Sequence, residues 1–403
     1  MSRTLFTGGE IFDTRTAAAT PADLVIEGDR IVDVGTDLDG DESVDLSGRT
    51  ILPGLFDCHT HVVLSHIDLW KLLQQPFSYR FYEAAANLRS TLDAGITTVR
   101  DAGGADLGIK KALQDGLITG PRLQISIRML SQTGGHGDEW LPSGTMAPIF
   151  VDYPGSPSSL VDGPDEMRRK VRELVRNGAD VIKVATSGGV LSPRDDPRHA
   201  HFRMDELDVL VSEAAAAGIW VMAHAQATEG IKNAIRAGIR SIEHGVYLDD
   251  EAISMMLDKG TYLVPTLVAP QGVISAAEAG AQIPEASLAK AKEVVEVHRE
   301  SFRKAVEAGV RVAMGTDSGV TRHGENLREL GLMAEGGMSP GQAIVATSAT
   351  AAELMGVQDE LGSLEPGKRA DLVVVEGDPL DLKTLRERIE AVYKDGERVA
   401  SST

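Results

Sequence analysis

Two histidines placed two positions apart form the first candidate metal-binding feature of this chain. His59 and His61 follow a short apolar run, residues 51–56, and flank Thr60. Side chains at positions i and i+2 of a strand share one face, so both imidazoles can reach the same cation. Because histidines also occur at strand ends without a metal, the pair alone indicates a metal site only weakly.

Other polar side chains lie in or directly after later apolar runs. They are Lys183, His224, His244 and Asp317. If the runs are parallel strands of a barrel, their carboxyl ends meet on one face and these side chains converge there. The chain has a single cysteine, so the ligands must be nitrogen and oxygen atoms. Together the six residues predict a metal centre.

Lys183 is the unusual member, because a protonated ammonium has no lone pair and repels cations. Burial and nearby positive charge both favour the neutral amine. A neutral lysine can add carbon dioxide and become a carbamate, an anionic oxygen ligand able to bridge two metals. The alternative is a lysine that extends from the strand end into solvent.

The elements that must position these residues alternate between helix and strand. Helical spacing of apolar residues predicts a helix over 165–178, and a glycine separates helix from strand at Gly95, Gly178, Gly218, Gly238, Gly260 and Gly309. Eight short apolar strands are expected near 52–57, 97–100, 123–128, 181–185, 220–223, 241–243, 262–265 and 312–315. This pattern predicts an α/β fold, a (β/α)8 TIM barrel over 54–356. The alternative is a doubly wound open sheet, but the chain lacks the GxGxxG turn of dinucleotide folds.

Both ends of the chain have a different pattern, in which short strands alternate with Gly and Asp turns. We expect residues 1–53 and 357–403 to form one small composite β-sandwich domain. The sequence from Glu365 to Lys368 is typical of the turn that leads back into it.

Composition limits the partners of the protein. A formal net charge of -20 disfavours binding to nucleic acid and leaves a small molecule as the expected partner, with homo-oligomer formation left open. No apolar run is long enough to cross a membrane, and no signal peptide is expected at the N-terminus. These features predict a cytoplasmic protein without membrane partners.

The order HxH, lysine, histidine, histidine, aspartate resembles the amidohydrolase superfamily over nearly the whole chain. The segments 134–138 and 186–190, with Gly245 after His244, resemble its prolidase and dipeptidase-like branch, which is related to imidazolonepropionases. The segment 362–372 resembles the composite β domain of the superfamily. The resemblance implies two divalent metal ions, zinc above all. His59, His61 and Asp317 would hold one ion, His224 and His244 the other, and Lys183, as N6-carboxylysine, would bridge them.

The same resemblance implies cleavage of an amide bond by a metal-bridging hydroxide. The substrate would be a dipeptide, Xaa-Pro or another Xaa-amino acid, or an N-acyl amino acid. Asp317 would transfer the proton and His136 would donate to the carbonyl oxygen as charge develops. Gln226, Arg322 and His323 are candidates for substrate contact.

Several neighbouring residues are weaker candidates. Arg194, Arg198 and Arg203 share the loops after the strands and are expected to be mostly solvated. His199 and His201 repeat the HxH spacing, but in a segment without strand character, so we interpret them as loop residues.

Two other functions compete with amide cleavage of this kind. A cyclic-amide hydrolase or deaminase could use the same barrel, although deaminases of this kind typically use one metal and lack the lysine. A non-catalytic barrel that serves as an assembly scaffold is the alternative from another class.

Overall fold

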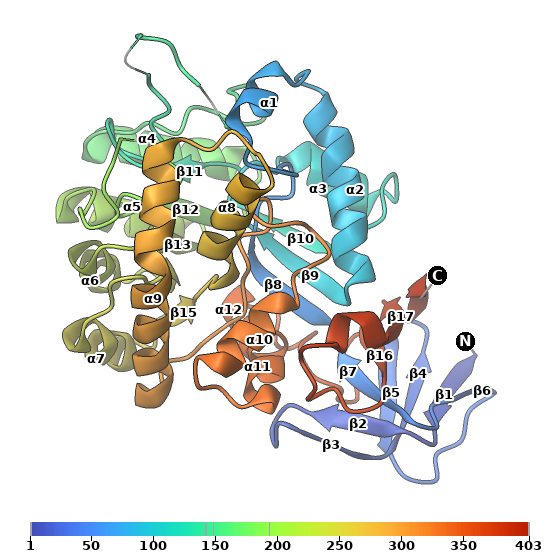
Figure 1. Ribbon diagram of the computed structural model, residues 1–403. Coiled ribbons are helices and arrows are strands. Elements are labelled where there is room, and N and C mark those ends of the chain that lie inside the picture. Colours follow the sequence, from blue (N-terminus) through green and yellow to red (C-terminus); the bar gives the residue numbers. More distant parts are fainter. Residues whose placement is uncertain (1, 142, 148, 193, 402–403) are drawn as a thin grey trace.

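The strands of the protein form four sheets in the computed structural model, which describes residues 2–141, 143–147, 149–192 and 194–401 (Figure 1). Two sheets hold the central strands, in the spatial orders β10 (Arg122–Ile125), β9 (Ile96–Asp101), β8 (Leu55–Thr60) and β11 (Met129–Leu130), β12 (Val181–Ala185), β13 (Trp220–Ala225), β14 (Ser241–His244), β15 (Tyr262–Val264). All pairs within these two sheets are parallel. The protein is therefore an α/β protein with a parallel strand arrangement at its centre.

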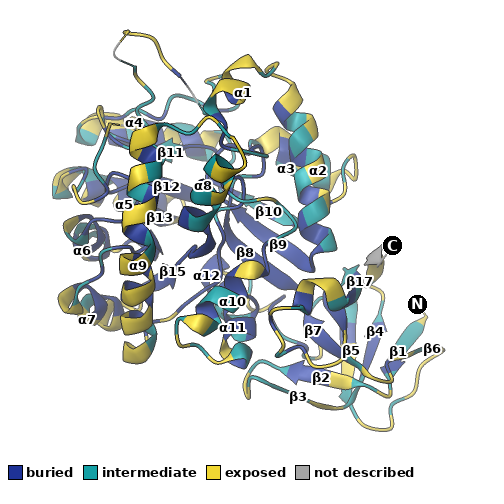
Figure 2. Ribbon diagram, in the orientation of Figure 1, coloured by how far each residue is buried: buried dark blue, intermediate teal, exposed yellow. Residues whose placement is uncertain are grey.

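Helices follow the central strands and cover their outer side, with their exposed faces turned to solvent (Figure 2). The helices are α1 (Leu69–Gln74), α2 (Tyr79–Asp93), α3 (Leu107–Gln114), α4 (Pro164–Arg176), α5 (Met204–Ala216), α6 (Thr228–Ala237), α7 (Asp250–Lys259), α8 (Val268–Glu278), α9 (Glu285–Ala308), α10 (Arg328–Glu335), α11 (Pro340–Ala346), α12 (Ala349–Met355) and the 3-10 helix η1 (Leu385–Arg388). Every residue of β8, β9, β12 and β14 is buried, as expected for strands covered on both faces.

The six glycines expected between helix and strand all adopt the left-handed conformation, with φ from 66° at Gly260 to 91° at Gly178. Each ends a helix in a conformation that only glycine adopts without strain, so the next strand can turn back along the core. This part of the sequence interpretation is confirmed, as is the helix expected over 165–178, which is α4.

Three expected strands differ from the structure. The run 52–57 is divided at Gly54 between β7 (Arg49–Pro53), which belongs to a terminal sheet, and β8. A Cβ at Gly54 would lie 2.3 Å from Thr97 Oγ1, so the chain passes between the two sheets where only glycine fits. The run 123–128 ends as β10 at Ile125 and resumes as β11 at Met129.

The eighth expected strand, 312–315, forms one isolated bridge, between Val312 and Leu263, in place of a regular strand. Its backbone is hydrogen bonded on both sides: the Ala313 amide donates to Leu263 O at 3.0 Å, and Met314 O accepts from the Cys58 amide at 2.9 Å. The segment thus lies between β15 and β8 and carries Asp317 to the same end as the first strand.

The two terminal sheets are built from both ends of the chain and lie beside the central strands (Figure 1). Their spatial orders are β5 (Arg30–Gly35), β4 (Asp23–Glu27), β1 (Arg3–Thr7), β6 (Glu42–Asp45) and β18 (Glu397–Ser401), β17 (Ile389–Lys394), β16 (Leu372–Glu376), β7, β2 (Glu10–Asp13), β3 (Ala18–Pro21). One apolar cluster, which includes Phe6, Ile51 and Leu372, joins both sheets. The expected turn also forms, with the Lys368 amide donating to Glu365 O at 3.1 Å.

Among the described residues, every helix is too short or too polar to cross a membrane.

Candidate active site

The predicted metal-binding residues come together at one end of the central strands. They follow or end β8, β13 and β14, and Asp317 lies in the segment 311–318, which contains the eighth expected strand. His61 Nε2 lies 3.2 Å and His59 Nε2 3.6 Å from Asp317 Oδ1. The ring centres of His59 and His244 are 5.1 Å apart, and those of His244 and His224 are 4.7 Å apart. The five side chains form one group at the carboxyl ends of the strands.

Lys183 lies inside this group and does not extend to solvent. Its side chain is 1% exposed, and its Nζ is 3.3 Å from His59 Nε2. Burial lowers the pKa of the Lys183 ammonium to about 8, against the opposing effect of Glu243 and Asp317. The neutral amine required for carbamate formation is therefore accessible near neutral pH.

Each imidazole of the group has one ring nitrogen occupied by a partner. The Nδ1 atoms of three histidines pair with oxygen atoms: His59 with Glu243 Oε2 at 2.7 Å, His61 with Gly103 O at 2.8 Å, and His244 with Thr266 Oγ1 at 2.7 Å. His224 differs, because its Nε2 lies 3.0 Å from Gly188 O. The remaining nitrogens, three Nε2 and one Nδ1, are left for a metal, as is usual for ligating histidines.

The charge states of the group suit metal binding. Burial lowers the pKa of His59, His224 and His244 well below its usual range, so these rings are neutral and keep a lone pair. Burial alone would raise the pKa of Asp317, but hydrogen bonding to His61 and nearby positive charge lower it to about 2. Asp317 is thus an ionised carboxylate at neutral pH.

Two of these residues adopt backbone conformations that are rare outside glycine. His244 has φ 71° and Asp317 has φ 60°. Such left-handed residues cost roughly 1–3 kcal/mol each and concentrate at functional sites. At His244 the amide of Gly245 donates to Glu243 O at 3.0 Å, which makes a tight turn at the end of β14. The turn lets the adjacent side chains of Glu243 and His244 both approach His59.

Sequence reasoning missed a buried ion pair that supports His59. Glu243 is 0% exposed and accepts from Arg100 Nη2 at 2.9 Å and from Ser241 Oγ at 2.5 Å, while its other oxygen holds His59 Nδ1. Arg100 also donates to Cys58 O at 2.7 Å. The position of Glu243 directly before His244 was a signal, but strict strand alternation sends neighbours to opposite faces.

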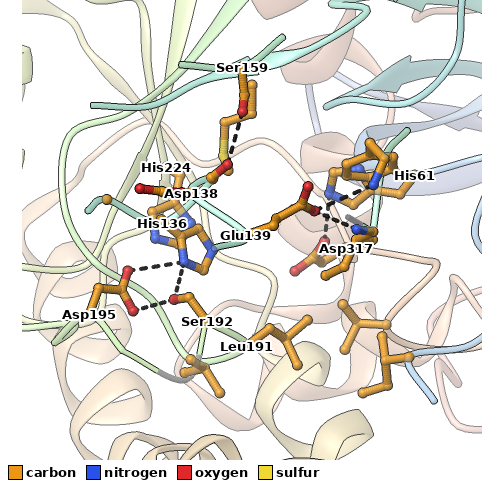
Figure 3. Close-up of a pocket in the computed structure, with 18 of the residues that line it drawn as sticks. His61, His136, Asp138, Glu139, Ser159, Leu191, Ser192, Asp195, His224 and Asp317 are labelled. Atoms are coloured by element: carbon orange, nitrogen blue, oxygen red, sulfur yellow. Dashed lines mark hydrogen bonds and ion pairs between the residues drawn. The ribbon is translucent and has the colours of Figure 1, made fainter. Parts of the chain in front are cut away.

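His136 forms a second polar group on the other side of the cavity (Figure 3). Its ring stacks on His224 at 4.2 Å between ring centres. Its Nδ1 lies 2.7 Å from Ser192 Oγ and 3.3 Å from Asp195 Oδ2, and Lys290 binds the carbonyl oxygens of this loop. Ser192, Asp195 and Lys290 were not expected from the sequence, since they belong to a loop and a distant helix.

A cavity of about 760 Å³ opens over the group and is lined largely by apolar side chains. Of the residues predicted to contact substrate, His136 and Gln226 line it, and Gln226 is buried with an Oε1 that has no hydrogen-bond partner among the described residues. Arg194 also lines it and stacks on Trp140, with Cζ 5.0 Å from the ring centre.

Other candidates lie elsewhere. The described lining residues include neither Arg322, which is exposed, nor His323, whose Nε2 donates to Leu64 O at 3.0 Å. His199 is exposed and His201 is buried beside the strand ends, but neither lines the cavity within the described part of the chain.

Comparison with protein families identifies the chain, because the model of the Amidohydrolase family matches residues 50–399. The protein belongs to the amidohydrolase family. A curated relative, the ochratoxinase of Aspergillus niger, is 37% identical over 363 residues, which cover 86% of this chain and 75% of the relative.

Solved structures agree with this assignment. A Xaa-Pro dipeptidase with bound methionine in its active site has a TM-score of 0.89 at 35% identity, covering 99% of this chain and 100% of the other. A prolidase complexed with N-methylphosphonate-L-proline has a TM-score of 0.90 at 34% identity and covers both chains completely. An imidazolonepropionase of Fusobacterium nucleatum is more distant, at 24% identity over 93% of this chain and 91% of its own. The predicted superfamily and its prolidase-like branch are confirmed, and the structural relatives imply a TIM barrel fold.

The donor set of this amidohydrolase fits divalent metals, which the family generally uses. His59, His244 and Asp317 each place one ligand atom so that the atoms lie within 4.8 Å of one another. Neutral imidazole and carboxylate are ligands that suit zinc and related ions.

We predict that Glu243→Gln lowers divalent-metal affinity by about 10- to 100-fold, because the amide holds the His59 ring less firmly in its ligating orientation. Competition with a chromophoric chelator measures this directly. Asp180→Asn is the matched control, since that carboxylate pairs with Lys110 at 2.6 Å outside the cavity. Equal affinities in the two variants would contradict the role given to Glu243.

His323 provides a test by pH. Burial lowers its pKa to about 4, against hydrogen bonds to Leu64 and His61 carbonyls. The unfolded chain therefore takes up a proton near pH 6.5 while the folded chain does not, and stability is lost as pH falls from 6.5 towards 4. The free energy of unfolding of the parent should therefore fall when the pH is lowered from 7.5 to 5. We predict that in His323→Gln this fall is smaller by about 2 kcal/mol. Urea unfolding at both pH values measures it, with exposed His199→Gln as control; identical losses in parent and His323→Gln would refute the argument.

Proposed function

We propose that this protein is a binuclear metal-dependent hydrolase that cleaves the amide bond of a dipeptide, Xaa-Pro or another Xaa-amino acid, or of an N-acyl amino acid. The observation that carries the proposal is Lys183, buried within 3.3 Å of His59 Nε2 among four histidines and an aspartate. A lysine at this place is explained by its N6-carboxylated form, an anionic bridge between two cations.

His59, His61 and Asp317 would hold one divalent ion and His224 and His244 the other, with zinc as the proposed metal. When bound, such ions lower the pKa of a coordinated water from about 15.7 towards about 7 and polarise a carbonyl group. Relatives that are named for amide substrates, the Xaa-Pro dipeptidase and the prolidase, support this choice of reaction.

The chain's own groups supply proton transfer and charge stabilisation. Asp317 Oδ1 is ionised and faces His61, so it is placed to take a proton from the attacking water and pass it to the leaving nitrogen. His136 has its Nδ1 held by Ser192 and Asp195, and its Nε2 would donate to the developing oxyanion. The apolar lining of the cavity excludes water around these groups.

Further parts of the proposal concern architecture and location. The hydrogen bonds of segment 311–318 to β15 and β8 support a closed (β/α)8 barrel over 54–356, and the mixed six-stranded sheet supports a composite β domain from 1–53 and 357–403. We also propose that the protein is cytoplasmic, acts on a small molecule and has no nucleic acid or membrane partner.

Metal analysis tests the proposal against its rivals. Elemental analysis of the purified protein should give about two divalent ions per chain. One ion would favour a deaminase, and none in a folded, metal-supplemented preparation would favour a non-catalytic scaffold; either result would overturn the proposal.

We predict that Lys183→Ala lowers dipeptide hydrolysis by more than about 100-fold, because both ions lose their shared ligand. Short carboxylic acids should restore part of the activity by taking the place of the carbamate. Lys232→Ala is the control, since that lysine is also little exposed but pairs with Asp249 at 2.7 Å outside the cavity. Full activity of untreated Lys183→Ala would exclude the bridging role.

A further inference from the structure

A carboxylate that the sequence interpretation did not use is buried beside the end of β15. Glu329, in the first turn of α10, is 0% exposed. Its Oε1 accepts from the Leu267 amide at 2.7 Å, and its Oε2 accepts from the Val268 amide at 2.8 Å. Both amides belong to the start of α8, which packs beside α10 (Figure 1). Glu329 therefore caps a helix that lies about 60 positions earlier in the chain, where charge-assisted hydrogen bonds to backbone amides are strong.

This carboxylate is a costly means of holding a helix end. Burial raises the pKa of Glu329 to about 8, and the negative charge of Asp57 acts in the same direction, although the two amides lower it. The starts of α3 and α7 are held more simply, by Asp106 and Asp249, the residues that directly precede each helix. A buried acid that reaches α8 from another helix indicates that the exact position of this helix start matters.

Thr266 is the residue whose position depends on this cap. It directly precedes Leu267, is fully buried and has φ 53°, a left-handed conformation that is unfavourable for a β-branched residue. Its carbonyl oxygen accepts from the Ala269 amide at 3.0 Å, so its backbone is tied to the first turn of α8. Its Oγ1 lies 2.7 Å from His244 Nδ1. Glu329 thus holds the backbone on either side of a strained residue that contacts a proposed metal ligand.

Different groups support the backbone and the ring of His244. His298 Nε2 donates to His244 O at 2.8 Å, whereas the hydrogen bond that the ring makes in the described chain is to Thr266. A displaced Thr266 would therefore release the ring while the backbone of His244 stays supported. Ligating imidazoles are oriented by the partner of their second nitrogen, and loss of that partner typically lowers metal affinity by about 10- to 100-fold.

We propose that Glu329 is a positioning residue for one of the two metal ions: it fixes Thr266, and Thr266 fixes the His244 ring with Nε2 toward the ion. The inference rests on the proposed function, in which His244 helps to hold the second ion. Glu243 has the corresponding role for the first ion, because it binds His59 Nδ1 at 2.7 Å. Two buried carboxylates would then serve the two ions separately, one directly and the other through a threonine.

Two single-site backgrounds test the inference by metal binding. His61→Ala removes a ligand of the first ion and leaves the second site, whereas His224→Ala does the reverse. With Zn²⁺ as the probe and a chromophoric chelator as competitor, Glu329→Gln should weaken binding by at least about 10-fold in His61→Ala and leave it unchanged in His224→Ala. Glutamine has nearly the same shape, but its amide N–H₂ would face one of the two backbone amides. Glu243→Gln is the matched control and should show the opposite pattern.

Further variants test the route through the threonine. Thr266→Val should reproduce the selective loss, and adding Glu329→Gln to it should cause little further loss, because both substitutions act on one contact. Glu329→Asp keeps the charge on a shorter side chain and should bind Zn²⁺ with intermediate affinity. It also decides the question if circular dichroism shows that Glu329→Gln does not fold.

The outcomes separate this inference from the proposed function. Equal weakening in both backgrounds, or unchanged binding in His61→Ala, would overturn the role of Glu329 while the binuclear site stands. The stoichiometry of the parent tests the proposed function by itself: fewer than two ions contradicts the binuclear site, and no ion overturns both statements. If the parent binds one ion, weaker binding by Glu329→Gln supports the positioning role and equal binding overturns it.

Discussion

Glu243 is the buried charge on which the arrangement of the site depends. Its carboxylate joins Arg100, which is bonded to the backbone of β8, and His59, the first histidine of the same strand. A carboxylate buried this completely is tolerated only when its oxygens are satisfied, and Arg100, Ser241 and His59 satisfy them. The ion pair of Glu243 with Arg100 therefore links β8, β9 and β14, and Glu243 sets the ring orientation of His59. The lone pair of His59 Nε2 is thereby directed at Asp317 and Lys183.

Neutral imidazoles with one nitrogen already occupied recur through the site. Four partners of three kinds hold these nitrogens: a carboxylate, two backbone carbonyls and a threonine hydroxyl. Burial keeps the rings of His59, His224 and His244 unprotonated, and the partner decides which nitrogen remains. The site is thus organised for cations by its surroundings as much as by the ligands themselves.

Local strain accompanies this organisation. His244, Asp317 and Ile127 all have positive φ, and each lies where a central strand ends or breaks. The packing around the strand ends maintains these conformations, since Ile127 and His244 are buried and Asp317 is partly buried. A regular strand would place Arg128 and His244 according to simple alternation, and neither would then approach the cavity in the observed way.

The sequence by itself determined the class of fold and the six polar residues that gather at the strand ends. Glycines after helices are required wherever a chain must turn through positive φ, and histidines after apolar runs are visible without coordinates, so the six-residue group could be predicted. Supporting residues could not, because Glu243 and Arg100 are 143 positions apart and Asp195 meets His136 only through loop packing. The tertiary structure also decided which side chains line the cavity. His323 was predicted to contact substrate but binds Leu64 O, whereas Arg128, at the end of an expected strand, lines the cavity after a strained turn. Sequence patterns record local conformation and side-chain chemistry. The pairing of charged groups that are far apart in the sequence is decided only when the strands pack.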